Sequence, residues 1–181
     1  MIDSQEARAA LSDIEEMVRR VRQSQTYDLA SLIMILWGVL VLAANIVNWL
    51  WPQLGNEIWI VTTIIGALAT LAIVYSRTGD HRVDFRMLAV YVLFFGFGYL
   101  ATQVLGHFTP RQLGAFWPIY FMLFYSIAGL WFGNAFIAIA SVITVLTLIG
   151  YFYIAGSAFL LWMAIVNGGG LILGGLWMRR S

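Results

Sequence analysis

The sequence predicts an all-α integral membrane protein: a bundle of six transmembrane helices preceded by a cytoplasmic amphipathic helix. Long apolar segments fill nearly all of the chain after residue 28. The composition agrees, with 61% hydrophobic residues, 10% charged residues and a mean hydropathy of +0.84, whereas a soluble domain carries about 25% charged residues. An apolar run that crosses about 30 Å of hydrocarbon needs roughly 20 residues, and it must be helical so that its backbone groups bond internally.

The chain divides into residues 1–28, the polar helix, and residues 29–181, the transmembrane domain. The polar start and the length of the first apolar run differ from a cleaved signal peptide, so we expect that run to remain as an anchor. Give or take a few residues at each end, the six expected spans are residues 29–50, 58–75, 87–106, 116–132, 135–153 and 158–178.

The N-terminal segment is predicted to be an amphipathic helix. Its apolar residues recur at a spacing of three and four, namely Ala7, Leu11, Ile14, Val18 and Val21. Asp3 and Glu6 form a plausible capping pair at its start. This helix either lies on the inner leaflet or beneath the bundle, or forms a short coiled coil with another subunit or a partner protein. No glycine or proline separates it from the first span, which permits one continuous helix.

The arginines predict the orientation. All ten basic residues are arginines, and with six spans nine of them fall on the side of the termini: Arg8, Arg19, Arg20, Arg22, Arg77, Arg82, Arg86, Arg179 and Arg180. Only Arg111 falls on the opposite side. The positive-inside rule then places both termini in the cytoplasm.

An internal repeat of helical hairpins is a further expectation. A shift of 58 positions carries Gly38 to Gly96 and, in the same way, Asn45 to Gln103, Pro52 to Pro110 and Trp59 to Trp117. The third hairpin fits less well, although Trp162 opens its returning helix. Coincidence within a low-diversity apolar sequence is the alternative explanation.

Three tandem hairpins, a polar N-terminus and a proline after the first span (Trp51-Pro52) resemble the small HdeD-type inner-membrane proteins of bacteria that are linked to acid resistance. The resemblance covers the arrangement of the spans, and no functional residue carries over. It implies a bacterial inner-membrane location.

Small residues predict close helix packing. Gly129 with Gly133, and Gly170 with Gly174, match the small-xxx-small pattern that allows helices to approach closely. The last span is especially rich in glycine, so another surface is expected to press against it. That surface is a neighbouring helix of the same chain, another subunit, or a flat ligand such as a lipid or quinone.

Polar residues within the spans are few, and they are candidates for one outward-facing polar pocket: Asn45, Asn48, Thr62, Gln103, His107 and Asn167. Helical spacing places Asn45 with Asn48 on one face, and Gln103 with His107 on another. Buried amides are costly unless they are paired. These groups therefore either join helices by hydrogen bonds or line a vestibule for a ligand or ion.

Composition argues against several function classes. The chain has no cysteine, and a net charge of +1 gives no reason to expect nucleic-acid binding. No Asp, Glu or Arg lies at mid-depth in a span, which disfavours a proton-driven carrier. We find no catalytic constellation and expect no enzyme activity, cofactor or metal site.

The leading hypothesis is a non-enzymatic scaffold or accessory subunit surrounded by membrane lipids. It would be a homo-oligomer, or would bind a membrane or cytoplasmic protein through the N-terminal helix. One alternative is a transporter or channel for a small solute that uses the outer polar pocket. Another is a lipid- or quinone-binding subunit of a redox complex.

Overall fold

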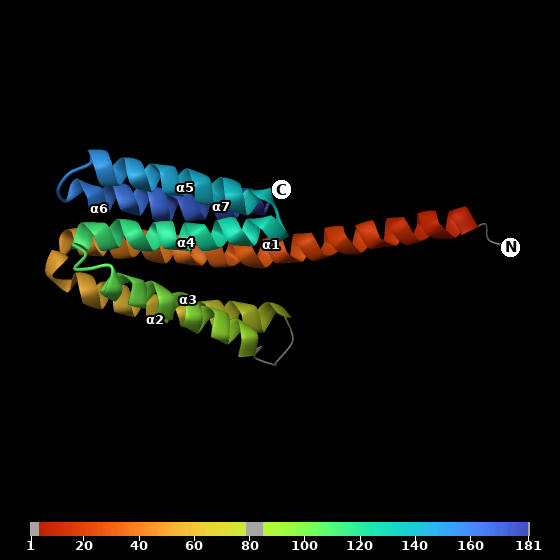
Figure 1. Ribbon diagram of the computed structural model, residues 1–181, viewed down its shortest axis with the longest axis horizontal. Helices are drawn as coiled ribbons and strands as arrows, with labels where there is room; N and C mark the ends of the chain where they lie inside the picture. Colours follow the sequence, from red (N-terminus) through yellow and green to blue (C-terminus); the bar gives the residue numbers. More distant parts are fainter. Residues whose placement is uncertain (1–3, 79–84, 181) are drawn as a thin grey trace.

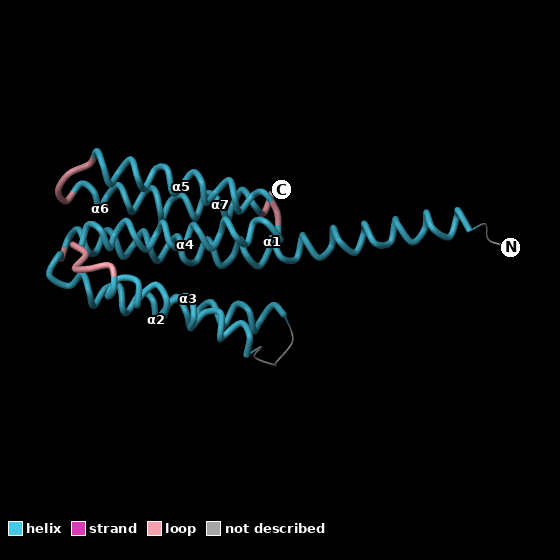
Figure 2. The backbone as a smooth tube through the Cα atoms, in the orientation of Figure 1, coloured by secondary structure: helices cyan, strands magenta, loops and turns pink. Residues whose placement is uncertain are grey.

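The computed structural model describes residues 4–78 and 85–180, and this part of the chain contains helices and turns and no strand. The elements in chain order are α1 (Ser4–Leu50), η1 (Pro52–Leu54), α2 (Gly55–Thr78), α3 (Phe85–Val104), α4 (Pro110–Phe132), α5 (Asn134–Tyr153), α6 (Ala158–Met163), the π-helical turn η2 (Ala164–Gly169) and α7 (Gly170–Met178). The helices α1, α2, α3, α4 and α5 alternate in direction, and the continuous run from α6 to α7 is antiparallel to α5 (Figure 2).

The helices form three layers of two rods each, as Figure 1 shows. The first layer holds α5 and the C-terminal rod, by which we mean the continuous run of α6, η2 and α7. The second holds α4 and α1, and the third holds α3 and α2. The contacts agree with this order, because α1 touches both the C-terminal rod and α2, while α5 touches both that rod and α4.

Helix α1 is a single rod of 47 residues that joins the expected N-terminal helix to the first span. It is continuous because no glycine or proline occurs before Gly38. Its N-terminal half projects well beyond the bundle (Figure 1). Asp3, the expected capping residue, lies outside the described residues.

Among the described residues, five helices are long and apolar enough to cross a membrane, which supports a multi-pass membrane protein. They are Thr26–Leu50, Pro52–Arg77, Pro110–Phe132, Asn134–Tyr153 and Ala158–Met178. The expected span at residues 87–106 is shorter, because its described apolar part is Ala89–Val104. Helix α3 ends there, and Gly106 turns the chain with a φ of 119°. Thr109 then caps α4 through a reciprocal bond pattern with Gln112, so α4 begins earlier than the expected residue 116.

The buried core lies among α1, α4, α5 and the C-terminal rod. Its members include Met34, Met122, Ile143 and Leu171, one from each of these four parts. By contrast, α2 and α3 expose wide apolar faces, and Leu68 and Leu93 are 63% and 70% exposed. A broad apolar surface of this kind is suited to contact with lipid chains.

Each helical hairpin contains a tryptophan ring packed on a glycine of the other helix. Trp37 of α1 lies against Gly66 of α2, and Trp117 of α4 lies against Gly98 of α3. In the third hairpin, Trp162 lies against Gly150 of α5. A glycine leaves room for a large ring, so the two helices of each hairpin are matched in shape.

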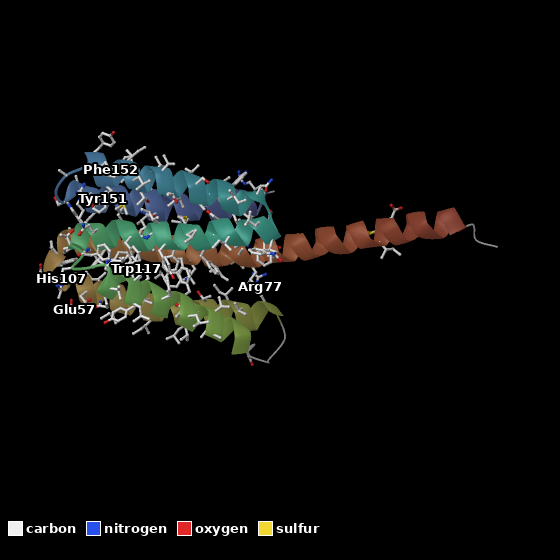
Figure 3. The ribbon with its side chains drawn as sticks, in the orientation of Figure 1. Glu57, Arg77, His107, Trp117, Tyr151 and Phe152 are labelled. Atoms are coloured by element: carbon white, nitrogen blue, oxygen red, sulfur yellow. The ribbon has the colours of Figure 1, made fainter. Side chains whose placement is uncertain are left out.

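The two ends of the molecule differ in charge. Figure 3 shows Arg77 at the end where the chain terminates, with Glu57 and His107 at the opposite end. Arg179 and Arg180 follow α7 at the first of these ends. Of the expected basic residues, Arg82 lies outside the described residues.

Candidate functional site

The predicted glycine pair in the last span faces α5. A Cβ atom added at Gly170 would lie 3.1 Å from Ile143 Cγ1, and one at Gly174 would lie 3.0 Å from Ile139 Cδ1. Both distances are tighter than ordinary contacts. This face of the C-terminal rod therefore meets a helix of the same chain.

A second glycine face of the same rod meets α1. A Cβ at Gly168 would lie 2.6 Å from the Leu42 Cα, and one at Gly175 would lie 2.8 Å from the Ser31 carbonyl oxygen. Gly38 of α1 adds to the contact, because its Cβ would lie 2.8 Å from the Gly168 carbonyl oxygen. The small-xxx-small pattern did not single out Gly168 and Gly175. Their spacing of seven residues, two helical turns, is the signal that could have paired them.

The other predicted pair lies where α4 turns into α5. A Cβ at Gly129 would lie 2.5 Å from Ile137 Cγ1, and Gly133 has a φ of 132° between the two helices. The first glycine allows close approach, while the second allows a sharp turn that other residues rarely adopt. Together they place α4 directly against α5.

Asn167 lies in the π-helical turn and contacts α5. It is 4% exposed, and its Oδ1 accepts a hydrogen bond of 3.4 Å from the fully buried Thr147 hydroxyl. Its Nδ2 donates to the Met163 sulfur at 3.5 Å. Both bonds are long, and a π-helical turn is an irregularity that often accompanies function. Here it joins the C-terminal rod to α5 by a buried polar contact.

The predicted polar residues near the first turn lie in three different settings. Asn45 is buried and donates to the Val41 carbonyl on its own helix at 2.9 Å. Asn48 lies against the start of α2, where a Cβ at Gly55 would be 2.8 Å from its Oδ1. Thr62 is buried on α2. Asn45 is thus satisfied locally, as polar side chains in membrane helices often are.

Gln103 and His107 are exposed, Gln103 near the end of α3 and His107 in the turn that follows. Figure 3 shows His107 at the tip of the molecule, at the same end as Glu57. Gln103 and His107 form no hydrogen bond with Asn45, Asn48, Thr62 or Asn167, all of which the structure describes. The structure therefore separates the buried amides from this exposed pair.

Arg111 has a structural role that the sequence did not single out. Its Nη2 donates to the carbonyls of Tyr151 and Ile154 at the C-terminal end of α5. Its guanidinium lies 4.6 Å from the centre of the Phe159 ring. A cation at a helix C-terminus satisfies carbonyls that lack an intrahelical partner and is favoured by the helix dipole. Arg111 therefore ties α4 to the turn between α5 and α6.

Helix α3 is held to α4 by aromatic rings. The Phe94 ring stacks on Tyr120 with centroids 4.4 Å apart, and it also meets Phe121 and Phe124. The Tyr120 hydroxyl donates to the Phe94 carbonyl at 3.0 Å. Large rings between two helices keep the backbones apart while filling the space. This contact contrasts with the glycine contacts of the C-terminal rod.

The projecting half of α1 offers the most accessible apolar surface outside the bundle. Ile14 and Met17 are 56% and 62% exposed there. In the part of the chain that the structure describes, no three His, Cys, Asp or Glu residues gather at one point. The projecting half of α1 thus carries exposed apolar side chains away from the bundle.

Comparison with protein-family models, with curated proteins and with solved structures finds no match to this chain.

Proposed function

We propose that this chain is a non-enzymatic scaffold or accessory subunit of a bacterial inner membrane, and that the projecting half of α1 binds protein partners. The observation that carries the proposal is the continuity of α1 from Ser4 to Leu50. A helix anchored in the bundle at one end presents its free end at a set position. Such a rod suits recognition of a partner by its side chains.

The closely packed bundle supports the role of a platform. Glycine contacts join the C-terminal rod to both α1 and α5. Arg111 and the Thr147–Asn167 contact add polar links among α4, α5 and that rod. Close packing holds the base of α1 in a defined position, so that the projecting half extends in a defined direction.

The proposed orientation has both termini in the cytoplasm. Its support is the charge difference between the two ends, with Arg77, Arg179 and Arg180 at one end and Arg111 at the other. The resemblance to HdeD-type proteins supports the bacterial inner membrane as the location.

The transporter hypothesis has less support than the scaffold. It depended on convergence of the predicted polar residues, yet Asn45 bonds to its own helix and Asn167 bonds to Thr147 and Met163. A lipid- or quinone-binding role depended on a glycine face open to a flat ligand. Gly168, Gly170, Gly174 and Gly175 instead face helices of the same chain.

Removal of the projecting helix tests the proposal. The full chain and a variant lacking residues 1–24 are purified in native-like lipid, and the mass of each complex is measured. The full chain is expected to form a complex, with itself or with a co-purifying protein, that the shortened chain loses. The control replaces Ser12 and Ser24 with Ala, which keeps the helix and its apolar stripe. Equal masses for the full and shortened chains would contradict the proposal.

A further inference from the structure

The direction of α1 determines what its apolar stripe can contact. The candidate span within α1 begins at Thr26, so about 22 helical residues precede it, a distance of roughly 33 Å at 1.5 Å per residue. Figure 1 shows this half continuing the line of the span, away from the bundle. A helix that leaves the membrane in the direction of its own span cannot also lie flat on the leaflet. Only another molecule in the aqueous phase can cover the stripe.

The stripe follows a heptad pattern. With Leu11 and Val18 at position a, Ile14 and Val21 fall at position d. The preceding d position is Ala7, and polar residues begin at the next a position, which is Gln25. The a and d positions are the ones that form the seam of a coiled coil. Of the side chains at Leu11, Ile14, Val18 and Val21, the structure describes that of Ile14, which is 56% exposed.

The charged residues are compatible with such a seam. Asp13 and Glu16 occupy the outward positions c and f, and the charged residues at position e are Arg8, Glu15 and Arg22. The g positions are Ala10, Met17 and Ser24, all uncharged, so the e and g contacts of a parallel pair contain no like-charge opposition. The pattern is therefore compatible with a seam between identical helices.

We propose that the occupant of this stripe is a second copy of the same chain, arranged as a parallel, in-register coiled coil. This inference rests on the proposed function and names the partner. Two copies in one membrane leave it at the same height and in the same direction, so Ile14 of one copy is level with Ile14 of the other. An antiparallel arrangement is excluded by the same geometry. The seam is short for a free coiled coil, but confinement of both helices to one membrane raises their effective concentration.

Cysteine cross-linking tests this register directly. The chain contains no cysteine, so a single introduced cysteine reports only on its own position. Full-length Ile14→Cys and Val18→Cys variants in native membranes are treated with a mild oxidant, alongside Asp13→Cys and Glu16→Cys. A disulfide needs Cα atoms within about 7 Å. Covalent dimers are therefore expected for the Ile14→Cys and Val18→Cys variants and are not expected for the Asp13→Cys and Glu16→Cys variants. Equal cross-linking at all four positions, or none at 14 and 18, would overturn the proposal.

A charge substitution provides the second measurement. Adding Val18→Asp to the Ile14→Cys variant is expected to abolish the cross-link, because it buries a carboxylate in the seam. Adding Ser12→Asp, at the outward b position, is expected to leave it unchanged. If both additions have the same effect, the self-assembly proposal fails. If cross-linking fails but removal of residues 1–24 still releases a different co-purifying protein, the scaffold function stands and only the self-association falls.

Discussion

The C-terminal rod and the α2–α3 pair are built from similarly apolar sequences, yet they pack in opposite ways. Half of the membrane-length window in the last span (50%) is buried within the molecule, against 11% of that in α2. The rod meets its neighbours through glycine, so backbones come close. The α3 helix meets α4 through aromatic rings, so backbones stay apart.

The difference shows how one helical chain can combine a dense core with an apolar rim that the rest of the molecule leaves exposed. Lipid tails are as apolar as leucine, so burial of apolar area adds little within a membrane. The strength of a helix–helix contact then depends on how closely the two surfaces fit. Glycine provides this fit at the interfaces of the C-terminal rod, and aromatic rings provide it between α3 and α4. We expect the glycine interface to be the less tolerant of change, because backbone atoms yield less readily than side-chain ends.

The largest expected effect is at Gly168. A Gly168→Ala substitution places a methyl group 2.6 Å from the Leu42 Cα. Overpacking of this kind costs about 1–3 kcal/mol, so the midpoint of thermal unfolding in lipid nanodiscs should fall. Gly169→Ala is the matched control, because a Cβ there meets nothing within 4 Å. Equal loss from both variants would contradict a special role for the face toward α1.

The next largest effect is expected at Arg111. An Arg111→Met substitution keeps much of the side-chain length but removes the bonds to the Tyr151 and Ile154 carbonyls. Hydrogen bonds from a charged donor contribute about 1.5–3 kcal/mol each, and the partial exposure of Arg111 places the expected loss near the lower end of that range. Hydrogen exchange should rise at the end of α5. The control is Arg77→Met at an exposed arginine, which should leave hydrogen exchange in α5 unchanged. Equal exchange at the end of α5 in the two variants would show that Arg111 does not cap this helix.

A smaller and more local effect is expected at the aromatic interface. Phe94→Ala removes the ring that meets Tyr120, Phe121 and Phe124. Aromatic pairs contribute about 0.5–1.5 kcal/mol each, and lipid can occupy part of the vacated space. Exchange or proteolysis should therefore increase in α3 with little change in α5. Phe97→Ala, at a ring that is 68% exposed, is the control. If Phe94→Ala unfolded the whole bundle, the stability of α5 and the C-terminal rod would depend on the contact between α3 and α4, which would contradict the prediction.

The smallest effect is expected at Thr70. A Thr70→Val substitution removes the 3.0 Å hydrogen bond from Trp37 Nε1, which links α2 to α1. Such bonds within membranes contribute about 0.6 kcal/mol on average, so the shift in unfolding midpoint should be small but measurable. Thr63→Val should cost less, because the Thr63 hydroxyl bonds only to Trp59 of its own helix. A larger loss from the Thr63 variant would argue against the α1–α2 link.

The candidate site shows that residue spacing along a helix does not predict which contacts a side chain makes. Helical periodicity correctly predicts that residues three or four apart share a side of a helix, but it does not say what lies opposite. Asn45 and Gln103 occupy equivalent places in the predicted repeat, yet the first is 4% exposed and the second is exposed. Gly38 and Gly96 differ in the same way, since only Gly38 has a close neighbour.

The sequence by itself determined the helical class, the approximate spans and the segregation of arginine. Each of these follows from local composition, because the free energy of placing a residue in hydrocarbon depends mainly on that residue and its neighbours in the chain. Only the tertiary structure decided that two glycines of the last span, Gly168 and Gly175, meet α1, while Gly170 and Gly174 meet α5. It also decided that the Arg111 side chain bonds to the carbonyls at the C-terminal end of α5. Those contacts depend on the shapes of segments far apart in the chain, and no local pattern encodes which faces will match.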